Sequence, residues 1–202
     1  MIKIGLTGGI SSGKSTVSEY LNDKYGVEII DADRIAYEIA EPDQPLWKAY
    51  VERYGAAKVL FDDKTLNRRA VADIVFSSAE EQAWMDSVVM PLVKAEINRR
   101  IDVCERRGDK VVVLDVPLLI EKSWESMADS VWVVYVNPQT QLERLMKRNN
   151  YDEKTAKMRI ASQMSLEDKK AKADIIIDNS GTLEDARKQV DTAWEKLTSA
   201  EG

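Results

Sequence analysis

The chain has 202 residues, of which 44% are hydrophobic and 32% charged, a composition typical of a folded globular protein. Its formal net charge of -6 argues against a general nucleic-acid binder, because such proteins are usually basic. It contains no histidine, which excludes an imidazole base, a serine–histidine pair and a histidine-bound metal, and leaves carboxylates, lysines, tyrosines or the lone cysteine as possible bases.

The cysteine count and the apolar pattern bear on where the protein works. Cys104 is the only cysteine, so no internal disulfide can form, and a reducing cytoplasm is the expected location. The N-terminus lacks the basic and apolar regions of a signal peptide, and no run reaches the roughly 18 apolar residues of a membrane span. We therefore expect no membrane partner, no nucleic-acid partner, and a monomer or small homo-oligomer.

Five short apolar runs, rich in β-branched residues, are predicted to be strands. They are continuous rather than alternating, which favours a parallel sheet covered on both faces. The predicted strands are residues 2–6, 27–30, 111–116, 131–136 and 175–177. Helical patterns lie between the predicted strands at residues 14–25 and 138–148, and a further one follows the last strand at residues 183–197. Asn137-Pro138 and Thr182 with Asp185 are helix-start signals. The order of elements predicts a doubly wound α/β fold.

Two intervals are too long for simple connections between strands. Residues 33–108 are predicted to be a mostly helical insertion, and residues 138–172 a helical pair with a local excess of positive charge. The remaining segments, 1–32, 109–137 and 173–202, form the predicted nucleotide-binding core.

The first strand is followed by a phosphate-binding motif. Gly8 to Ser15 match G-x-x-x-x-G-K-[ST] in full, with a predicted strand before them and a predicted helix after them. The glycines let backbone N–H groups point at phosphate oxygens, and the helix N-terminus adds its positive dipole. Lys14 is expected to reach the β- and γ-phosphates, and the Ser15 hydroxyl to hold Mg²⁺. The predicted ATP-binding residues of this loop are Gly9, Ile10, Ser11, Ser12, Gly13, Lys14, Ser15 and Thr16.

The fate of the bound phosphate depends on what accompanies the loop. The DxxG and (N/T)KxD elements of switch GTPases are absent. Motor-like ATPases carry Asp-Glu after an apolar strand, whereas Asp115 is followed here by Val116. This weakens the hydrolase interpretation without excluding it, and Asp115 could also be a structural aspartate at a strand end.

Phosphoryl transfer needs a group that can accept the proton of the acceptor hydroxyl. Asp33 follows the second predicted strand, at the sheet edge from which the phosphate loop also emerges. It can therefore serve as the base while the γ-phosphoryl group moves. Either Asp31 or Asp33 could instead cap the next helix, and the two roles are compatible.

The basic residues of the second interval favour transfer over hydrolysis. Arg144 and Arg148 share one helical face, and Arg159 lies on the next predicted helix. Mobile arginines can neutralise the charge of a transferred phosphoryl group and exclude water. The alternative for each arginine is a solvated charged surface.

Taken together, these stretches resemble the dephospho-coenzyme A kinase family over almost the whole chain. The resemblance rests on GLTGGISSGKST, IDADRIAYEI, TLNRRAVADIVF, VVVLDVPLLIE, QLERLMKRN, RIASQMS and ADIIIDNSGTLED. It implies a P-loop NTPase-type α/β fold, built on a doubly wound five-stranded parallel sheet with a helical substrate-binding insertion and a helical lid. It also implies transfer of the γ-phosphoryl group of ATP, with Mg²⁺, to the 3′-hydroxyl of dephospho-coenzyme A.

The resemblance further implies roles for single residues. Asp33 would be the catalytic carboxylate, aided by Lys14, Arg148 and Arg144, the arginines closing over the phosphates. The implied acceptor-site residues are Asp33, Arg68, Asp115, Leu118 and Leu119. Asn179 would lie near the adenine of ATP. The insertion aromatics could stack on the acceptor, or could simply be core; they are Tyr37, Trp47, Tyr50 and Tyr54.

Two positions depart from the family pattern. Met90-Pro91 stands where the family usually has His-Pro, so Met90 is assigned no catalytic role and is expected inside a helix that Pro91 kinks. Ser11 stands where the family often has glycine, and a serine there is expected to stiffen the turn. Two alternatives stay open: a P-loop kinase of another small nucleotide or hydroxyl acceptor, and a non-catalytic ATP-binding regulatory module.

Overall fold

The computed structural model describes residues 1–199 and divides the chain into two compact units. The first unit comprises Met1–Ile30 and the chain from Cys104 onward, and the second comprises Asp31–Val103. Within the described residues, no helix combines the length and apolar character needed to cross a membrane.

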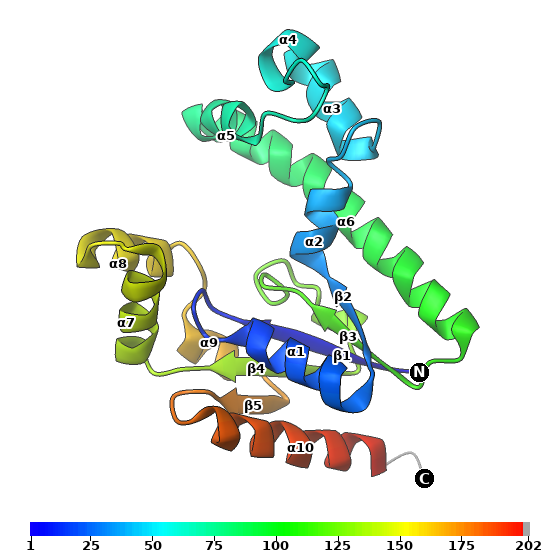
Figure 1. Cartoon of the computed structure of the whole chain (residues 1–202), viewed down its shortest axis with the longest axis vertical. Coiled ribbons are helices and arrows are strands. Elements are labelled where there is room, and N and C mark those ends of the chain that lie inside the picture. The colour runs from blue at the N-terminus through cyan, green and yellow to red at the C-terminus, as the bar shows by residue number, and fades with distance from the viewer. Residues whose placement is uncertain (200–202) are drawn as a thin grey trace. The chain divides into compact units, whose positions relative to one another are not determined.

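A five-stranded parallel sheet forms the centre of the first unit (Figure 1). Its strands are β1 (Ile2–Gly8), β2 (Glu28–Asp31), β3 (Val111–Asp115), β4 (Ser130–Tyr135) and β5 (Ile175–Asp178), in the spatial order β2-β3-β1-β4-β5. The central strands β1, β3 and β4 are buried on both faces, as their continuous apolar runs predict. The edge strands are partly exposed. The predicted parallel α/β sheet is confirmed.

The register of the sheet brings two functional segments to one edge. Leu6 of β1 lies opposite Asp115 of β3, and Gly8 lies opposite Val134 of β4. β1 thus pairs with β3 over its first part and continues alongside β4 at its end. The phosphate loop begins where these neighbours diverge.

Helices cover both faces of the sheet. α1 (Lys14–Tyr25) and α10 (Leu183–Ser199) pack on the face that carries Ile4, Trp132 and Val134. Tyr135 points to the opposite face, because side chains alternate along a strand, and there it packs against Leu166 of α9 (Leu166–Lys170). α10 begins with the predicted reciprocal hydrogen bonds of Thr182 and Asp185.

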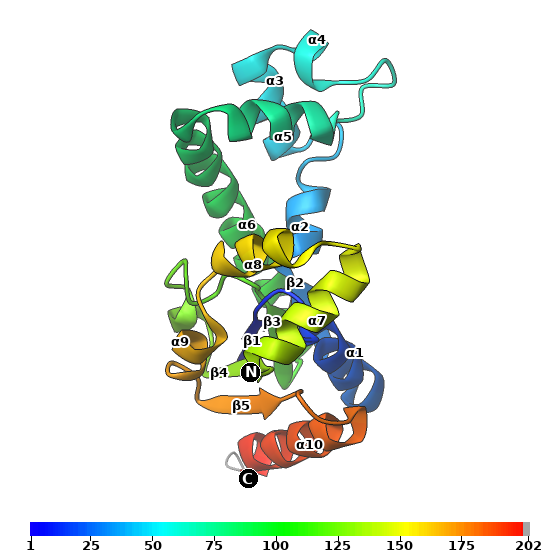
Figure 2. The same ribbon diagram turned by 90° about the vertical axis from the view of Figure 1, so that its left-hand side faces the viewer.

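The segment between β4 and β5 contains two further helices, α7 (Pro138–Asn149) and α8 (Glu153–Ala161), which lie beside one another (Figure 2). The side chain of Asn137 accepts a hydrogen bond from the Thr140 N–H, and Pro138 is the first helical residue, as predicted. Asn150 ends α7 in a left-handed conformation, with φ 52°. A short 3-10 helix, Glu125–Met127, precedes β4.

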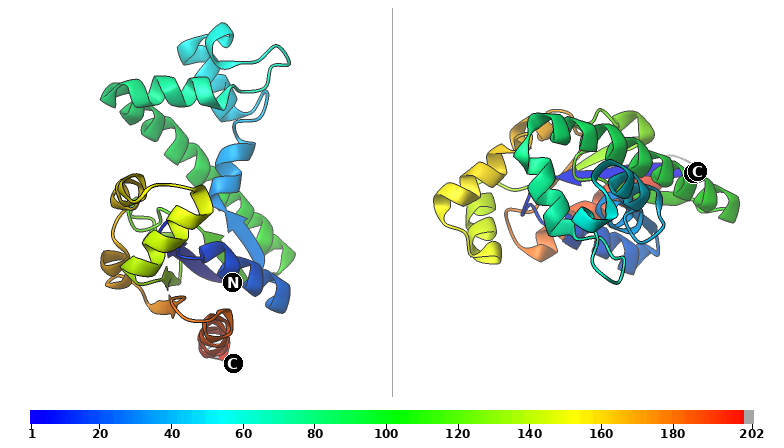
Figure 3. Two further views of the ribbon diagram at one scale, coloured as in Figure 1. Left: turned by 60° about the vertical axis from the view of Figure 1, so that its left-hand side comes forward. Right: turned by 90° about the horizontal axis from the view of Figure 1, so that it is seen from above.

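The second unit is helical, as predicted from the insertion. It contains α2 (Ala32–Glu38), α3 (Pro45–Tyr54), α4 (Ala56–Val59), α5 (Arg68–Ser77) and α6 (Ala79–Arg107) as far as Val103. α3 to α5 gather at one end of the long α6, as the cyan and green segments in Figure 3 show. α6 runs through Pro91 as one helix, and Met90 lies half-buried within it.

Two of the insertion aromatics belong to the packing of the second unit. Tyr50 is buried and lies with its ring centroid 6.0 Å from that of Trp84, while the Tyr54 ring meets Trp84 edge-on at 5.4 Å. Burial raises the pKa of Tyr54 to about 12. Trp47 donates to the Lys64 carbonyl, and Tyr37 is 56% exposed. Tyr50 and Tyr54 therefore hold α3 against α6.

Candidate active site

The phosphate loop connects β1 to α1 and takes a conformation that requires special backbone angles. Gly13 has φ 87°, and a Cβ at this position would lie 2.1 Å from the Asn179 amide nitrogen. Only glycine fits there, because both the backbone angle and the space exclude a side chain. Ser11 also adopts a positive φ, 59°, in which a non-glycine residue is strained.

Two polar groups of the loop lack, among the described residues, a hydrogen-bond partner of the kind that a bound phosphate would supply. In the part of the chain that the structure describes, the hydroxyl oxygens of Ser11 and Ser12 are buried and lack a hydrogen-bond partner. Buried hydroxyls normally find a partner. The N-terminus of α1, which is the positive end of the helix dipole, follows directly. The loop residues therefore fit a bound polyphosphate.

Lys14 and Asp115 form an ion pair at the base of the loop. The carboxylate side chain is only 4% exposed and the lysine side chain 17% exposed. Asp115 ends β3, and Lys14 begins α1, so the pair links the two segments across the edge of the sheet. A phosphate that attracts the Lys14 ammonium would compete with Asp115 for it.

Three amide side chains form hydrogen bonds with the backbone of the loop. Gln163 accepts the Ile10 N–H at 2.8 Å, and Gln141 donates to the Ile10 carbonyl at 2.9 Å. Asn179 donates to the Ser12 carbonyl at 2.8 Å. The prediction that Asn179 lies near adenine stays a prediction; the structure gives its amide a contact with the loop. Gln141 and Gln163 were not predicted, since neither belongs to a phosphate motif.

The predicted lid arginines differ in their surroundings. Arg144 donates from Nη2 to the Asn179 carbonyl at 2.9 Å, which places it beside the phosphate loop. Arg148, one turn further along α7, is exposed and donates to its neighbour Asn149. Arg159 is exposed on α8. Closure of Arg144 and Arg148 over phosphates stays a prediction.

The turn after β3 contains the predicted acceptor-site leucines. Leu118 is half-buried, whereas Leu119 is fully buried. A Cβ at Gly5 of β1 would lie 2.8 Å from Leu119, so this leucine packs tightly under the sheet. Contact of either leucine with an acceptor stays a prediction.

A buried lysine, which was not singled out from the sequence, reaches the same turn. Lys169 of α9 is fully buried, and its ammonium group lies 2.9 Å from Glu121, 2.7 Å from the Pro117 carbonyl and 3.3 Å from the Gly8 carbonyl. The only sequence signal was its i,i+3 spacing from the buried Leu166, which places the two on one helical face.

In the second unit, the structure distinguishes Asp31, which ends β2, from Asp33, which lies in the first turn of α2. The Asp31 carboxylate accepts hydrogen bonds from the N–H groups of Asp33 and Arg34, and so caps α2. Asp33 is exposed in the first turn of the helix. The cap function therefore belongs to Asp31.

Arg68 begins α5 in the same unit and is paired with an aromatic ring. Its guanidinium carbon lies 3.8 Å from the centroid of the Tyr37 ring, and Nη2 donates to the Tyr37 carbonyl at 3.2 Å and to Glu41 at 3.4 Å. The pair is exposed. Its participation in acceptor binding stays a prediction.

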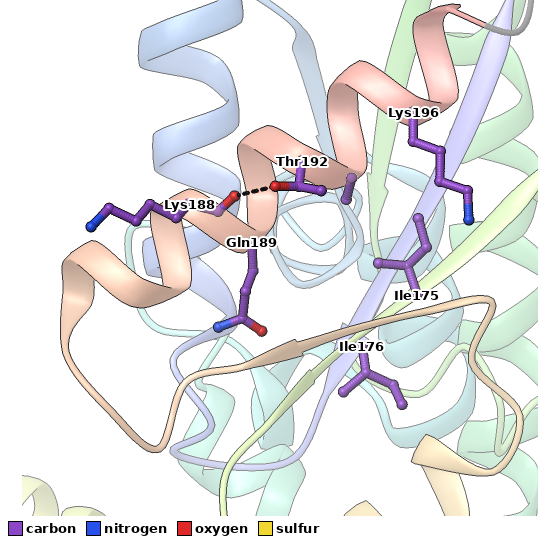
Figure 4. Close-up of a pocket in the computed structure, with 7 residues that line it drawn as sticks. Ile175, Ile176, Lys188, Gln189, Thr192 and Lys196 are labelled. Atoms are coloured by element: carbon purple, nitrogen blue, oxygen red, sulfur yellow. Dashed lines mark hydrogen bonds between the residues drawn. The ribbon is translucent and has the colours of Figure 1, made fainter.

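A separate depression lies on the first unit between β5 and α10 (Figure 4). Its lining combines apolar side chains with two lysines: Ile175, Ile176, Lys188, Gln189, Thr192, Ala193 and Lys196. None of these residues belongs to the phosphate loop or to its contacts described above. The candidate active site is therefore the phosphate loop with its surrounding carboxylate, amide and basic side chains.

Comparisons with known proteins agree with this site. A family model described as dephospho-CoA kinase matches residues 2–185. A dephospho-CoA kinase from Shouchella clausii (strain KSM-K16) is 44% identical over 195 residues, covering 96% of this chain and 98% of that protein. The solved dephospho-CoA kinase from Campylobacter jejuni has a TM-score of 0.76 at 26% identity, covering 99% of this chain and 98% of that one. The TT1252 structure from Thermus thermophilus has a TM-score of 0.79 at 29% identity, covering 97% of each chain.

Proposed function

Because the chain belongs to the dephospho-CoA kinase family, it is an ATP-dependent transferase of CoA biosynthesis, and we propose how its own residues carry out the transfer. The reaction moves the γ-phosphoryl group of ATP to the 3′-hydroxyl of dephospho-CoA and yields CoA and ADP. The enzyme therefore has to bind the phosphates of ATP, orient a hydroxyl group and exclude water.

The phosphate loop binds the donor. The N–H groups of Ile10, Ser12 and Thr16 donate to Gln163, Gly9 and Gly13, so we propose that other N–H groups of the loop, with the two unpartnered hydroxyls of Ser11 and Ser12, face the polyphosphate. Lys14 leaves Asp115 and contacts the β- and γ-phosphates, where its charge offsets the charge that spreads over the transferred group.

A divalent metal accompanies ATP in kinases, and we propose Mg²⁺ held by the Ser15 hydroxyl. Ser15 is an exposed residue in the first turn of α1. When bound, the metal would supply positive charge that offsets the charge of the phosphates. We propose that the Asp115 carboxylate, once Lys14 has left it, would face this added positive charge.

Asp33 is the proposed base for the acceptor hydroxyl. It is the exposed carboxylate of the DAD sequence, while Asp31 is engaged in capping α2. A carboxylate can accept a hydroxyl proton late in a loose phosphoryl transfer, when the hydroxyl has become acidic. Arg68 and Leu118 are the proposed acceptor contacts, and Arg144 and Arg148 the residues that close over the phosphates.

The observation that carries the proposal is the phosphate loop with its unpartnered buried hydroxyls, held by Gln141, Gln163 and Asn179 from the segment that follows β4. A loop supported in this way is preorganised to bind phosphate, which is the main requirement of phosphoryl transfer. We further propose that the enzyme works in the cytoplasm as a monomer or small homo-oligomer and binds neither nucleic acid nor membrane.

The direct test measures ADP release from ATP and Mg²⁺ with and without dephospho-CoA, and identifies the product by mass. We expect ADP only when the acceptor is present, matched by a product that is heavier by one phosphoryl group. Equal ADP release without acceptor would indicate hydrolysis. Higher turnover with a nucleoside or another hydroxyl acceptor would assign the site to a different kinase, and ATP binding without ADP would indicate a regulatory module.

A further inference from the structure

Lys169 occupies a position where a charged side chain is not needed for packing. It is one of the largest fully buried side chains of the protein, and burial lowers the pKa of its ammonium group. A buried ion pair can often be replaced by apolar residues of similar volume without loss of stability. Stability alone therefore does not explain the ion pair of Lys169 with Glu121.

The acceptors of Lys169 belong to two different segments of the candidate site. Gly8 ends β1 and starts the phosphate loop, and Pro117 lies in the turn after β3 that carries the predicted acceptor contacts. An ammonium group has three N–H donors, and here they face Gly8, Pro117 and Glu121. One side chain thus joins the donor segment to the acceptor segment.

Lys169 makes these hydrogen bonds at the place where the sheet no longer connects the two segments. β1 and β3 pair as far as Leu6 and Asp115, and the Val116 N–H adds one more bond to the Leu6 carbonyl at 3.0 Å. Beyond this point β1 continues beside β4 and the loop turns away. Lys169 spans the opening, together with the Thr7 hydroxyl, which donates to the Pro117 carbonyl at 3.0 Å.

Satisfying the Pro117 carbonyl alone does not require the lysine, because the Thr7 hydroxyl already donates to it. The lysine adds the link to Gly8 and ties both carbonyls to α9. α9 itself is fixed to the core by Leu166, which packs on Tyr135, and by Glu167, which accepts from the Tyr135 hydroxyl at 2.6 Å. The bridge therefore rests on a rigid support.

We propose that Lys169 is a positioning residue for the transfer reaction: its ammonium group sets the distance between the phosphate loop and the turn at Pro117, and hence between phosphoryl donor and acceptor. This inference rests on the proposed function of the two segments. Phosphoryl transfer depends on the alignment of donor and acceptor, and a misplacement of about 1 Å can lower the rate on the order of 100-fold.

The test compares three variants of the full-length enzyme. Lys169→Met leaves the Glu121 carboxylate without its ion-pair partner, while the Met164 N–H still donates to it, and is expected to lower both stability and kcat. Lys169→Met combined with Glu121→Met removes the whole ion pair, and we expect it to restore most of the thermal stability but not kcat. Lys172→Met removes an exposed lysine from the same segment and should behave as the wild type.

The decisive readout is the split between kcat and KM in the double variant. We expect kcat, referred to the folded fraction, to fall on the order of 100-fold, with KM for ATP and for dephospho-CoA changed less than about threefold. A double variant with wild-type kcat would overturn the inference, and so would a raised KM for ATP with normal kcat. Absence of acceptor-dependent ADP from the wild type would instead count against the proposed function.

Discussion

The two units of this protein place their charged side chains differently. Near the phosphate loop of the first unit, Lys169 is fully buried and the Asp115 side chain is 4% exposed. In the second unit, the network that joins α2 to α6 is half-exposed: the side chains of Arg100, Glu38 and Glu96 are 28%, 35% and 19% exposed.

The difference teaches which charges serve the fold and which serve the chemistry. Half-exposed pairs lose little solvation and add modest stability, so the second unit can use them to connect helices. Buried charges lose far more solvation, and the first unit keeps them beside the loop that we propose to bind the phosphates of ATP. Substitution of a buried charge near the phosphate loop should therefore lower transfer, whereas substitution in the half-exposed network should lower the free energy of unfolding.

The largest expected effect is that of Lys14→Met. The variant loses the cation that we propose to contact the phosphates and leaves Asp115 buried without its partner, so transfer should fall on the order of 1,000-fold and stability should also decrease. Steady-state turnover and thermal unfolding measure the two effects. Lys188→Met, on the exposed side of α10, is the matched control and should change neither. Turnover within tenfold of the wild type would contradict the role of Lys14.

Asp33→Asn should have the second largest effect on transfer. Asp33 differs from the other charges of the second unit discussed above, because it is exposed and yet proposed to act in the chemistry. Transfer should fall ~100-fold or more while ATP binding persists, because an amide cannot accept the hydroxyl proton. Titration with ATP and single-turnover kinetics separate the two properties.

Asp31→Asn is its matched control two residues away. Asparagine caps a helix about as well as aspartate, so this variant should keep transfer within about threefold of the wild type and keep its stability. The reverse pattern, with Asp31→Asn inactive and Asp33→Asn active, would exchange the roles that we assign.

The elements that sequence reasoning predicted are those that depend on near neighbours in the chain. The phosphate loop, the strands around it and the capping bonds of Asn137 and Thr182 follow from patterns a few residues long. The choice between Asp31 and Asp33 as the cap needed the structure, because both residue types and both positions suit a helix start.

The supports of the loop were not predicted because their partners are remote in sequence. Lys169 bonds to a carbonyl 161 residues away, and Gln163 to an N–H 153 residues away. A lysine among many lysines gives no sign that it is buried, since its composition and spacing fit a solvated surface equally well. Such contacts arise only when the segment after β4 packs on the loop.

Arg100→Gln tests the half-exposed network of the second unit. Arg100 pairs with both Glu38 and Glu96, so its loss should lower the free energy of unfolding by about 1–2 kcal/mol, between the values for exposed and buried pairs. Arg99→Gln is the control, because Arg99 is 62% exposed and its ion pair is with Glu96, and it should lower the free energy of unfolding much less. Urea unfolding at pH 7 measures both, and equal effects would contradict the network.

The same variant has a defined pH dependence. Arg100 lowers the pKa of Glu38 in the folded state, and Arg99 with Arg100 lowers that of Glu96 to about 2. A carboxylate whose folded pKa is depressed stabilises the fold above its unfolded pKa of about 4.5, and this contribution is lost as the pH falls below that value. Arg100→Gln should therefore lose less stability than the wild type on acidification from pH 5 to pH 3, roughly.

The smallest expected effect, that of Ser11→Gly, concerns strain kept at the phosphate loop itself. Glycine adopts the φ of 59° without strain and removes a buried hydroxyl that lacks a partner, so the nucleotide-free enzyme should become about 1 kcal/mol more stable. Ser12→Ala is the comparison, since it removes the other unpartnered hydroxyl without relieving a left-handed backbone.

Thermal unfolding with and without ATP and Mg²⁺ separates the two contributions of Ser11. If its hydroxyl donates to a phosphate, the glycine variant binds ATP more weakly. Its stability advantage must then shrink as ATP is added, because a ligand that binds only the folded state stabilises it by RT ln(1 + L/Kd), where L is the concentration of free ligand. An advantage that stays constant with ATP would show that Ser11 contributes strain alone. In that case the backbone, Ser12 and Lys14 would make the phosphate contacts of the loop. The buried hydroxyl of Ser11 would then only destabilise the turn relative to a glycine at this position.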